Sequence, residues 1–129
     1  MGSHTGERNM TQSRRALIVE DDLDDADLIA AILETEGFTS TIAVEGQEGF
    51  RIATSEAFDL AVVDITLPGW DGYEMMNSLS LVQEQLPILV VSGKPPEEIR
   101  SKVSHPNVID VIQKPFSLDR IRETLAKIK

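Results

Sequence analysis

Cysteine is absent from the sequence, and positive charge is scarce. The lack of cysteine excludes disulfide bonds, thiolate metal sites and a thiol nucleophile. Only 12 Lys and Arg residues stand against 22 Asp and Glu residues, and the net charge of −10 lacks the positive field that nucleic-acid binding needs. No apolar run approaches the ~18 residues of a membrane helix, and the run at residues 16–19 is too short for a signal peptide. We therefore expect a cytoplasmic protein that contacts neither membrane nor nucleic acid directly and whose chemistry uses oxygen or nitrogen groups.

The length of 129 residues suits one domain. Residues 1–13 are polar, small or charged and show no periodicity, and their opening letters, Met1-Gly2-Ser3-His4, resemble an expression remnant. We therefore expect a disordered tail over residues 1–13 and a single folded domain over residues 14–129.

Short apolar runs alternate with helical patterns along the rest of the chain. The apolar runs predict five strands, at residues 15–20, 38–44, 58–64, 87–92 and 108–112. Helical patterns start near residues 24, 46, 73, 95 and 117, and the first and last of them place Leu28 and Leu118 on apolar faces. This alternation predicts an α/β fold, a doubly wound, flavodoxin-like sheet of five parallel strands in the order 2-1-3-4-5.

Polar side chains follow four of the five predicted strands. Glu20 and Asp21 follow the first strand, Asp64 ends the third, Ser92 ends the fourth and Lys114 comes just after the fifth. Ligands of such folds sit beyond the carboxyl ends of the strands, and the first and third strands flank the point where the strand order reverses. We therefore expect both acidic strand ends to meet at one site.

The densest acidity is Glu20-Asp21-Asp22 followed by Asp24, Asp25 and Asp27. A helix dipole favours anions near its N-terminus, which accounts for Asp24, Asp25 and Asp27. It does not account for Glu20-Asp21-Asp22, and Glu20 and Asp21 are the residues of this group that we assign to the site.

The carboxylates of Glu20, Asp21 and Asp64 form a set of hard oxygen donors that suits Mg²⁺ or Mn²⁺ and suits zinc poorly. Their negative charges nearly balance those of a divalent cation and Lys114. An incoming phosphoryl group adds anionic oxygens, for which the metal, Lys114 and the Ser92 hydroxyl are the candidate binding groups. A carboxylate can also act as a nucleophile and form an aspartyl phosphate, so these residues indicate phosphoryl transfer.

Four motifs resemble a response regulator receiver domain of two-component signalling. They are the letters VEDD at residues 19–22, DITLPGWDGYE at 64–74, VVSG at 90–93 and KPF at 114–116. The resemblance covers residues 14–129 and implies a chemotaxis-regulator-like domain in which Asp64 takes a phosphoryl group from a partner's phosphohistidine. It implies Ser92 and Lys114 as the other catalytic groups.

The same resemblance implies a cofactor and partners. The cofactor is Mg²⁺ (or Mn²⁺), with Glu20, Asp21, Asp64 and the main-chain carbonyl of Thr66 as ligands and Asp21 the more direct of the acidic pair. The partner is a histidine kinase or a histidine phosphotransfer protein, and the domain acts as a monomer or weak dimer on a downstream protein. Such a domain is a signalling phosphoacceptor rather than an enzyme, with intrinsic Mg²⁺-dependent self-phosphorylation and autodephosphorylation chemistry.

Val111 departs from the family, most members of which carry an aromatic residue three positions before the lysine. This departure leaves open a second function, a receiver-like protein-binding module that is never phosphorylated. A third function, an aspartate-nucleophile phosphatase of the haloacid dehalogenase type, needs a general acid two positions after Asp64, where this chain has Thr66.

Overall fold

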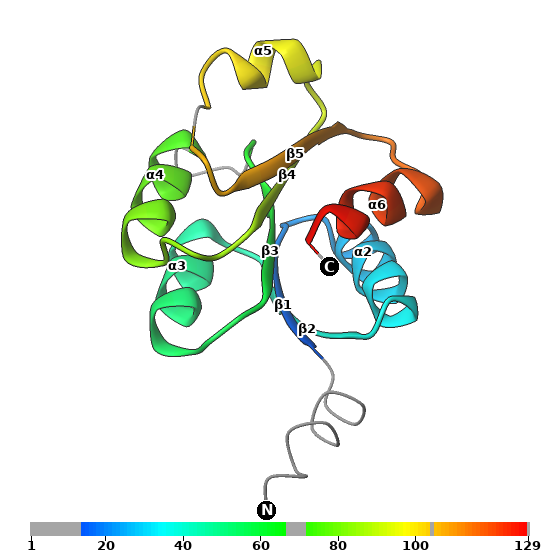
Figure 1. Ribbon diagram of the computed structural model, residues 1–129, viewed down its shortest axis with the longest axis horizontal. Helices are drawn as coiled ribbons and strands as arrows, with labels where there is room; N and C mark the ends of the chain where they lie inside the picture. Colours follow the sequence, from blue (N-terminus) through cyan, green and yellow to red (C-terminus); the bar gives the residue numbers. More distant parts are fainter. Residues whose placement is uncertain (1–13, 67–71, 104, 129) are drawn as a thin grey trace, which may run out of the picture.

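Strands and helices alternate along the chain in the structure, a computed structural model that describes residues 14–66, 72–103 and 105–128 (Figure 1). The strands are β1 (Arg14–Val19), β2 (Phe38–Ala43), β3 (Leu60–Asp64), β4 (Ile88–Ser92) and β5 (Val108–Gln113). The helices are α2 (Leu23–Thr35), α3 (Gly46–Ser55), α4 (Gly72–Val82), α5 (Pro96–Arg100) and α6 (Leu118–Leu125), and a short 3₁₀ turn, η1 (Ala126–Ile128), follows α6. The expected tail at residues 1–13 lies outside the described residues and stays a prediction. Among the helices that the structure describes, none is long and apolar enough to cross a membrane.

The five strands form one parallel sheet in the order β2-β1-β3-β4-β5, which confirms the predicted fold class and strand order. Helices α2 and α6 cover one face, and α3, α4 and α5 cover the other (Figure 1). Strands β3 and β4 are buried along their whole length because helices lie on both sides of them. This burial explains why their sequences are apolar without alternation.

Side chains define where α2 and α6 begin. Asp22 Oδ1 accepts a hydrogen bond from the backbone N–H of Asp25 at 3.0 Å, and Ser117 Oγ accepts one from that of Arg120 at 3.2 Å. Asp22 is therefore the N-cap of α2. This corrects the interpretation of Glu20-Asp21-Asp22 as one group separate from the helix start, because only the first two residues precede the cap.

Two leucines expected on apolar helix faces are exposed instead. Leu28 is 46% exposed and Leu118 is 38% exposed. In α2 the buried stripe runs through Ala26, Ile29 and Leu33, so Leu28 falls beside it rather than on it. The fourth helix, α5, has only five residues, and Ile99 is the residue of α5 that is buried.

A buried carboxylate, Asp110 on β5, ties the last two helices and η1 to the sheet. Its side chain is 4% exposed. Its oxygens face three cations and two neutral donors: Arg100 at 3.1 Å, Arg120 at 2.8 and 3.1 Å, Lys127 at 3.2 Å, the Thr124 hydroxyl at 2.8 Å and the Val111 N–H at 2.8 Å. Burial alone would raise the pKa of Asp110, but the hydrogen bonds, first of all those from Arg120, outweigh burial and hold this pKa well below its usual range.

Replacing Asp110 with asparagine is expected to lower the free energy of unfolding at pH 7 by about 2–4 kcal/mol, because buried donors lose their acceptor. Since the pKa of Asp110 is lowered by folding, its stabilisation is present above the unfolded-state pKa of about 3.9 and is lost as pH falls below it. The difference between wild type and Asp110→Asn in urea unfolding should therefore begin to shrink at about pH 5, roughly one unit above that pKa, and should continue to shrink as the pH falls toward the lowered pKa of the folded state. Asp119→Asn, at the exposed start of α6, is the matched control and should change little. A difference that stays constant with pH would contradict this account.

Candidate functional site

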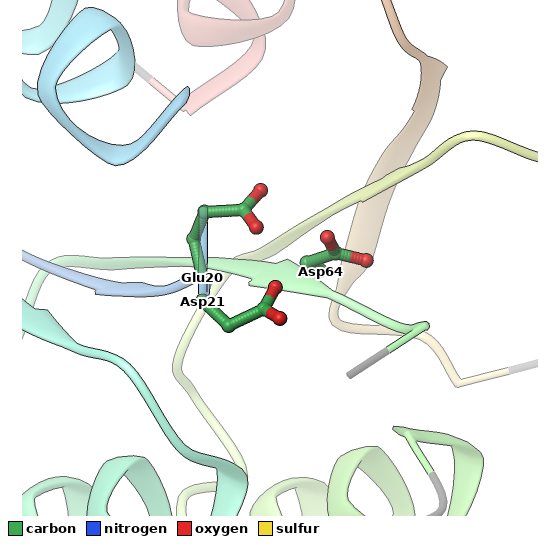
Figure 2. Close-up of side chains that lie close together, drawn as sticks. All are labelled: Glu20, Asp21 and Asp64. Atoms are coloured by element: carbon green, nitrogen blue, oxygen red, sulfur yellow. The ribbon is translucent and has the colours of Figure 1, made fainter. Parts of the chain in front are cut away.

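The strand order places the polar ends of β1 and β3 next to each other. Val19 pairs with Val63, so the residues that follow them, Glu20 and Asp64, reach the same edge of the sheet. Carboxylate oxygens of Glu20, Asp21 and Asp64 lie within 4.8 Å of one another, and Figure 2 shows the three groups turned toward a common space. Glu20 and Asp64 are buried and Asp21 is exposed. The sheet therefore brings the acidic strand ends together, as expected.

Lys114 supplies the positive charge inside this acidic group. Its Nζ lies 2.6 Å from Glu20 Oε1, 2.8 Å from Asp64 Oδ2 and 3.0 Å from Asp25 Oδ2. Burial alone would lower the pKa of Lys114, but hydrogen bonds to these three carboxylates outweigh burial and raise it above its usual value. Lys114 therefore stays a cation, and three carboxylates share it.

Asp64 is held through both of its carboxylate oxygens. Oδ1 accepts hydrogen bonds from the Thr66 backbone N–H at 2.8 Å and from the Thr66 hydroxyl at 2.7 Å, while Oδ2 faces Lys114. Burial would raise the pKa of Asp64, but the hydrogen bonds from Lys114 and Thr66 outweigh it and leave the pKa below its usual value. Asp64 is therefore an ionised and oriented carboxylate, which is the state that a nucleophile needs.

Glu20 shows the opposite balance. Burial raises the pKa of Glu20 to about 7, and the contact with Lys114 and the hydrogen bond from the Asp22 N–H, 3.1 Å from Oε2, oppose it only in part. One ammonium group therefore does not compensate for burying this carboxylate beside Asp64. A divalent cation would supply the missing charge, and carboxylate oxygens are the donors that hard cations prefer. The residues fit Mg²⁺ or Mn²⁺.

A match to one protein family covers almost all of the sheet and the site at this edge of it. A family model for the response regulator receiver domain matches residues 16–126. The chain belongs to this family. The match begins within β1 and ends in η1, so the receiver domain accounts for the sheet, its helices and the four chain segments that form the site.

Part of a longer curated protein resembles this receiver domain in sequence. The chain is 36% identical over 106 residues to the transcriptional activator protein PfeR of Pseudomonas aeruginosa, a match that covers 82% of the chain and 34% of PfeR. The chain likewise spans about half the length of two further curated transcriptional regulatory proteins that it matches.

Solved structures of receivers share the fold. A CheY-like response regulator receiver domain protein from Methanospirillum hungatei superposes with a TM-score of 0.82 at 28% identity, covering 90% of this chain and 93% of that one. The response regulator protein TrrA from Thermotoga maritima, determined in complex with Mg²⁺-BeF, gives a TM-score of 0.80 at 25% identity, covering 90% and 99%. The likeness confirms a CheY-like receiver fold for this chain.

Ser92 lies on the strand next to Asp64 in this receiver. Asp64 pairs with Val91, so Ser92 is one residue further along β4, where its side chain is buried. Its hydroxyl accepts a hydrogen bond from the Lys94 N–H at 3.0 Å, and its carbonyl accepts one from the Lys114 N–H at 2.8 Å. Ser92 therefore connects the end of β4 to the segment that carries Lys114.

Two further residues show how the receiver is packed near the site. A Cβ atom added to Gly72, the first residue of α4, would lie 2.0 Å from the carbonyl oxygen of Ile65, so glycine alone permits this approach to the residue that follows Asp64. Val111 is 3% exposed and packs on the face covered by α3, α4 and α5. The departure noted in the sequence is therefore a small side chain that is buried.

Sequence reasoning missed two contacts of this site. Asp25 was assigned only to the helix dipole, yet its carboxylate contacts Lys114. Thr66 was expected to act through its main-chain carbonyl, a role that stays a prediction, whereas its N–H and hydroxyl both hold Asp64. The sequence contains no signal that separates Asp25 from its neighbour Asp24, because both are acids in the first turn of α2.

Proposed function

We propose that residues 14–129 form one receiver domain in which Asp64 accepts a phosphoryl group from the phosphohistidine of a histidine kinase or a histidine phosphotransfer protein. The observation that carries the proposal is the state of Asp64. It is a buried carboxylate kept ionised by Lys114 and Thr66, beside two further carboxylates that fit a divalent cation.

In the transfer step, a carboxylate oxygen of Asp64 forms a bond to phosphorus while the bond between phosphorus and the histidine nitrogen breaks. The electron pair of that bond goes to the leaving imidazole, and the product is an aspartyl phosphate. Lys114 and the Ser92 hydroxyl bind oxygens of the transferred group. The ammonium of Lys114 is already 2.8 Å from the Asp64 carboxylate, so it needs little movement to do this.

Glu20, Asp21, Asp64 and the main-chain carbonyl of Thr66 would hold Mg²⁺ or Mn²⁺. When bound, the cation supplies charge neutralisation for the phosphoryl oxygens. The same site would accept phosphoryl groups from small donors and would lose them by hydrolysis, so the domain carries its own slow chemistry without being a dedicated enzyme. In this proposal the domain works in the cytoplasm, as a monomer or weak dimer, and passes its signal to a downstream protein rather than to nucleic acid or a membrane.

Val111 supports a second candidate, a receiver-like module that binds partners without being phosphorylated, because a small buried side chain occupies the position of the usual aromatic residue. The phosphatase alternative is disfavoured by Thr66, whose hydroxyl donates to Asp64 and is no general acid.

Incubation with Mg²⁺ and acetyl phosphate tests the proposal. We expect intact-mass spectrometry to show the gain of one phosphoryl group, because the site holds an ionised nucleophile with cations around it. The gain should require the divalent cation, so that a chelator prevents it, and hydroxylamine should remove the group because an acyl phosphate is labile to that nucleophile. Binding of Mg²⁺ without any gain in mass would favour the module that is never phosphorylated.

A further inference from the structure

Asp25 stands apart from the other carboxylates around Lys114. Glu20 and Asp64 come from strand ends, whereas Asp25 comes from the first turn of α2, on one side of the group. Its backbone N–H is fixed by the Asp22 side chain at 3.0 Å, and its own carboxylate is about one-third exposed. The capping contact therefore sets the position from which Asp25 reaches Lys114.

A bound cation would affect the three contacts of Lys114 differently. The Nζ of Lys114 lies within 3.0 Å of one oxygen from each of three carboxylates, and the contact with Asp64 has hydrogen-bond geometry. Glu20 and Asp64 also belong to the set of oxygens that lie within 4.8 Å of one another and fit a divalent cation, but Asp25 does not. A cation at that set competes with Lys114 for two of its three partners and leaves the third untouched.

We propose that Asp25 is a positioning residue that keeps the ammonium of Lys114 beside Asp64 once a divalent cation has taken the oxygens of Glu20 and Asp64. The inference rests on the proposed function, because it assumes the metal site described above. Without Asp25, the cation would displace a half-buried lysine that forms no ion pair with a fourth carboxylate among the described residues. Metal binding would then carry the cost of leaving Lys114 unpaired, in addition to losing one negative charge from the surroundings.

A simpler explanation is that Asp25 only adds charge to the helix start, as Asp24 does. Asp24 is exposed and adjacent in sequence, and it is not among the carboxylates that pair with Lys114 in the described part of the chain, which makes Asp24→Asn the matched control. If Asp25 acts only through its charge, the two substitutions should have similar effects. If it acts through Lys114, its effect should be larger and should depend on Lys114.

The experiment is calorimetric titration of the full chain with Mg²⁺ alone. We expect Asp25→Asn to raise the Kd for Mg²⁺ about fivefold to tenfold, within the usual range of coupling between sites, and Asp24→Asn to raise it less than about twofold. In a Lys114→Met background, Asp25→Asn should have no more effect than Asp24→Asn, because the group that Asp25 positions is gone. Thermal unfolding of each variant without Mg²⁺ checks that the Asp22 cap and the fold survive.

Equal effects of the two asparagine substitutions, or an undiminished effect of Asp25→Asn in the Lys114→Met background, would overturn the role of Asp25 and leave the metal site standing. Failure of the wild type to bind Mg²⁺ would overturn the metal site itself and this inference with it. The two failures are therefore distinguishable in one set of titrations.

Discussion

Replacing Asp64 with asparagine is expected to reduce phosphoryl uptake from acetyl phosphate to background while leaving the fold intact. Asparagine keeps the shape of the side chain and an oxygen that can accept the hydrogen bonds from the Thr66 N–H and hydroxyl, so β3 and the following turn should keep their contacts. It removes the ionised oxygen that forms the bond to phosphorus, and neither Ser92 nor Thr66 offers an ionised replacement. Intact-mass spectrometry of both proteins, with the same donor and Mg²⁺, measures the difference.

Asp59→Asn is the matched control for this substitution. Asp59 precedes β3 and accepts a hydrogen bond from the Arg15 N–H at 2.8 Å, so it is an acid on the same segment that has no contact with Lys114. Its loss should leave phosphoryl uptake unchanged. Retention of the phosphoryl group in Asp64→Asn, for example on the exposed Asp21, would show that the nucleophile has been assigned to the wrong carboxylate.

The stability of Asp64→Asn provides a second readout, in which two opposing effects should nearly cancel. Glu20 and Asp64 are buried side by side, and Glu20 responds with a pKa raised to about 7, first by burial and then, in smaller part, by the charge of Asp64. Removing one of two neighbouring buried charges relieves part of their repulsion, whereas the lost ion pair to Lys114 acts against it. Thermal unfolding of the variant at pH 7 should therefore stay close to that of the wild type, which separates a loss of chemistry from a loss of folding.

The sheet was predictable from the sequence for a physical reason. Strands buried on both faces must be apolar throughout, so β3 and β4 appear as short continuous runs, and a charge that ends such a run marks the edge where solvent or ligand begins. The order of the strands then determined that Glu20 and Asp64 meet. Neither step required knowledge of side-chain directions.

The contacts that could not be predicted all depend on such directions. Asp22, Asp24 and Asp25 have the same chemistry in neighbouring positions, yet one caps α2, one faces solvent and one contacts Lys114. The rotation of α2 against the sheet determines which of these carboxylates contacts Lys114 and which faces solvent. The same rotation leaves Leu28 exposed. The periodicity of the sequence indicates an apolar face but sets its centre only to within about one residue, because neighbouring positions differ by about 100° around a helix.

Replacing Lys114 with methionine is expected to separate metal binding from phosphoryl binding. Methionine has similar length and no charge, so the variant loses the cation that lies 2.6–3.0 Å from three carboxylates. Mg²⁺ then no longer competes with the ammonium for Glu20 and Asp64, and its affinity should rise about tenfold, a change of about 1.4 kcal/mol. Phosphoryl uptake should nevertheless fall about 100-fold, as expected when one charged donor to the transferred group is removed.

A rise in Mg²⁺ affinity together with a fall in phosphoryl uptake would identify the role of Lys114, because a misfolded variant would not show this combination. A misfolded variant would lose both Mg²⁺ affinity and phosphoryl uptake. If Lys114 served only to neutralise the acids, its replacement would change Mg²⁺ affinity without changing phosphoryl uptake. Lys114→Arg keeps the charge and should therefore restore much of the lower Mg²⁺ affinity of the wild type. Its planar group directs its donors differently from an ammonium, so phosphoryl uptake should be restored only in part. Tighter Mg²⁺ binding with undiminished phosphoryl uptake in Lys114→Met would contradict the proposed contact between Lys114 and the phosphoryl oxygens.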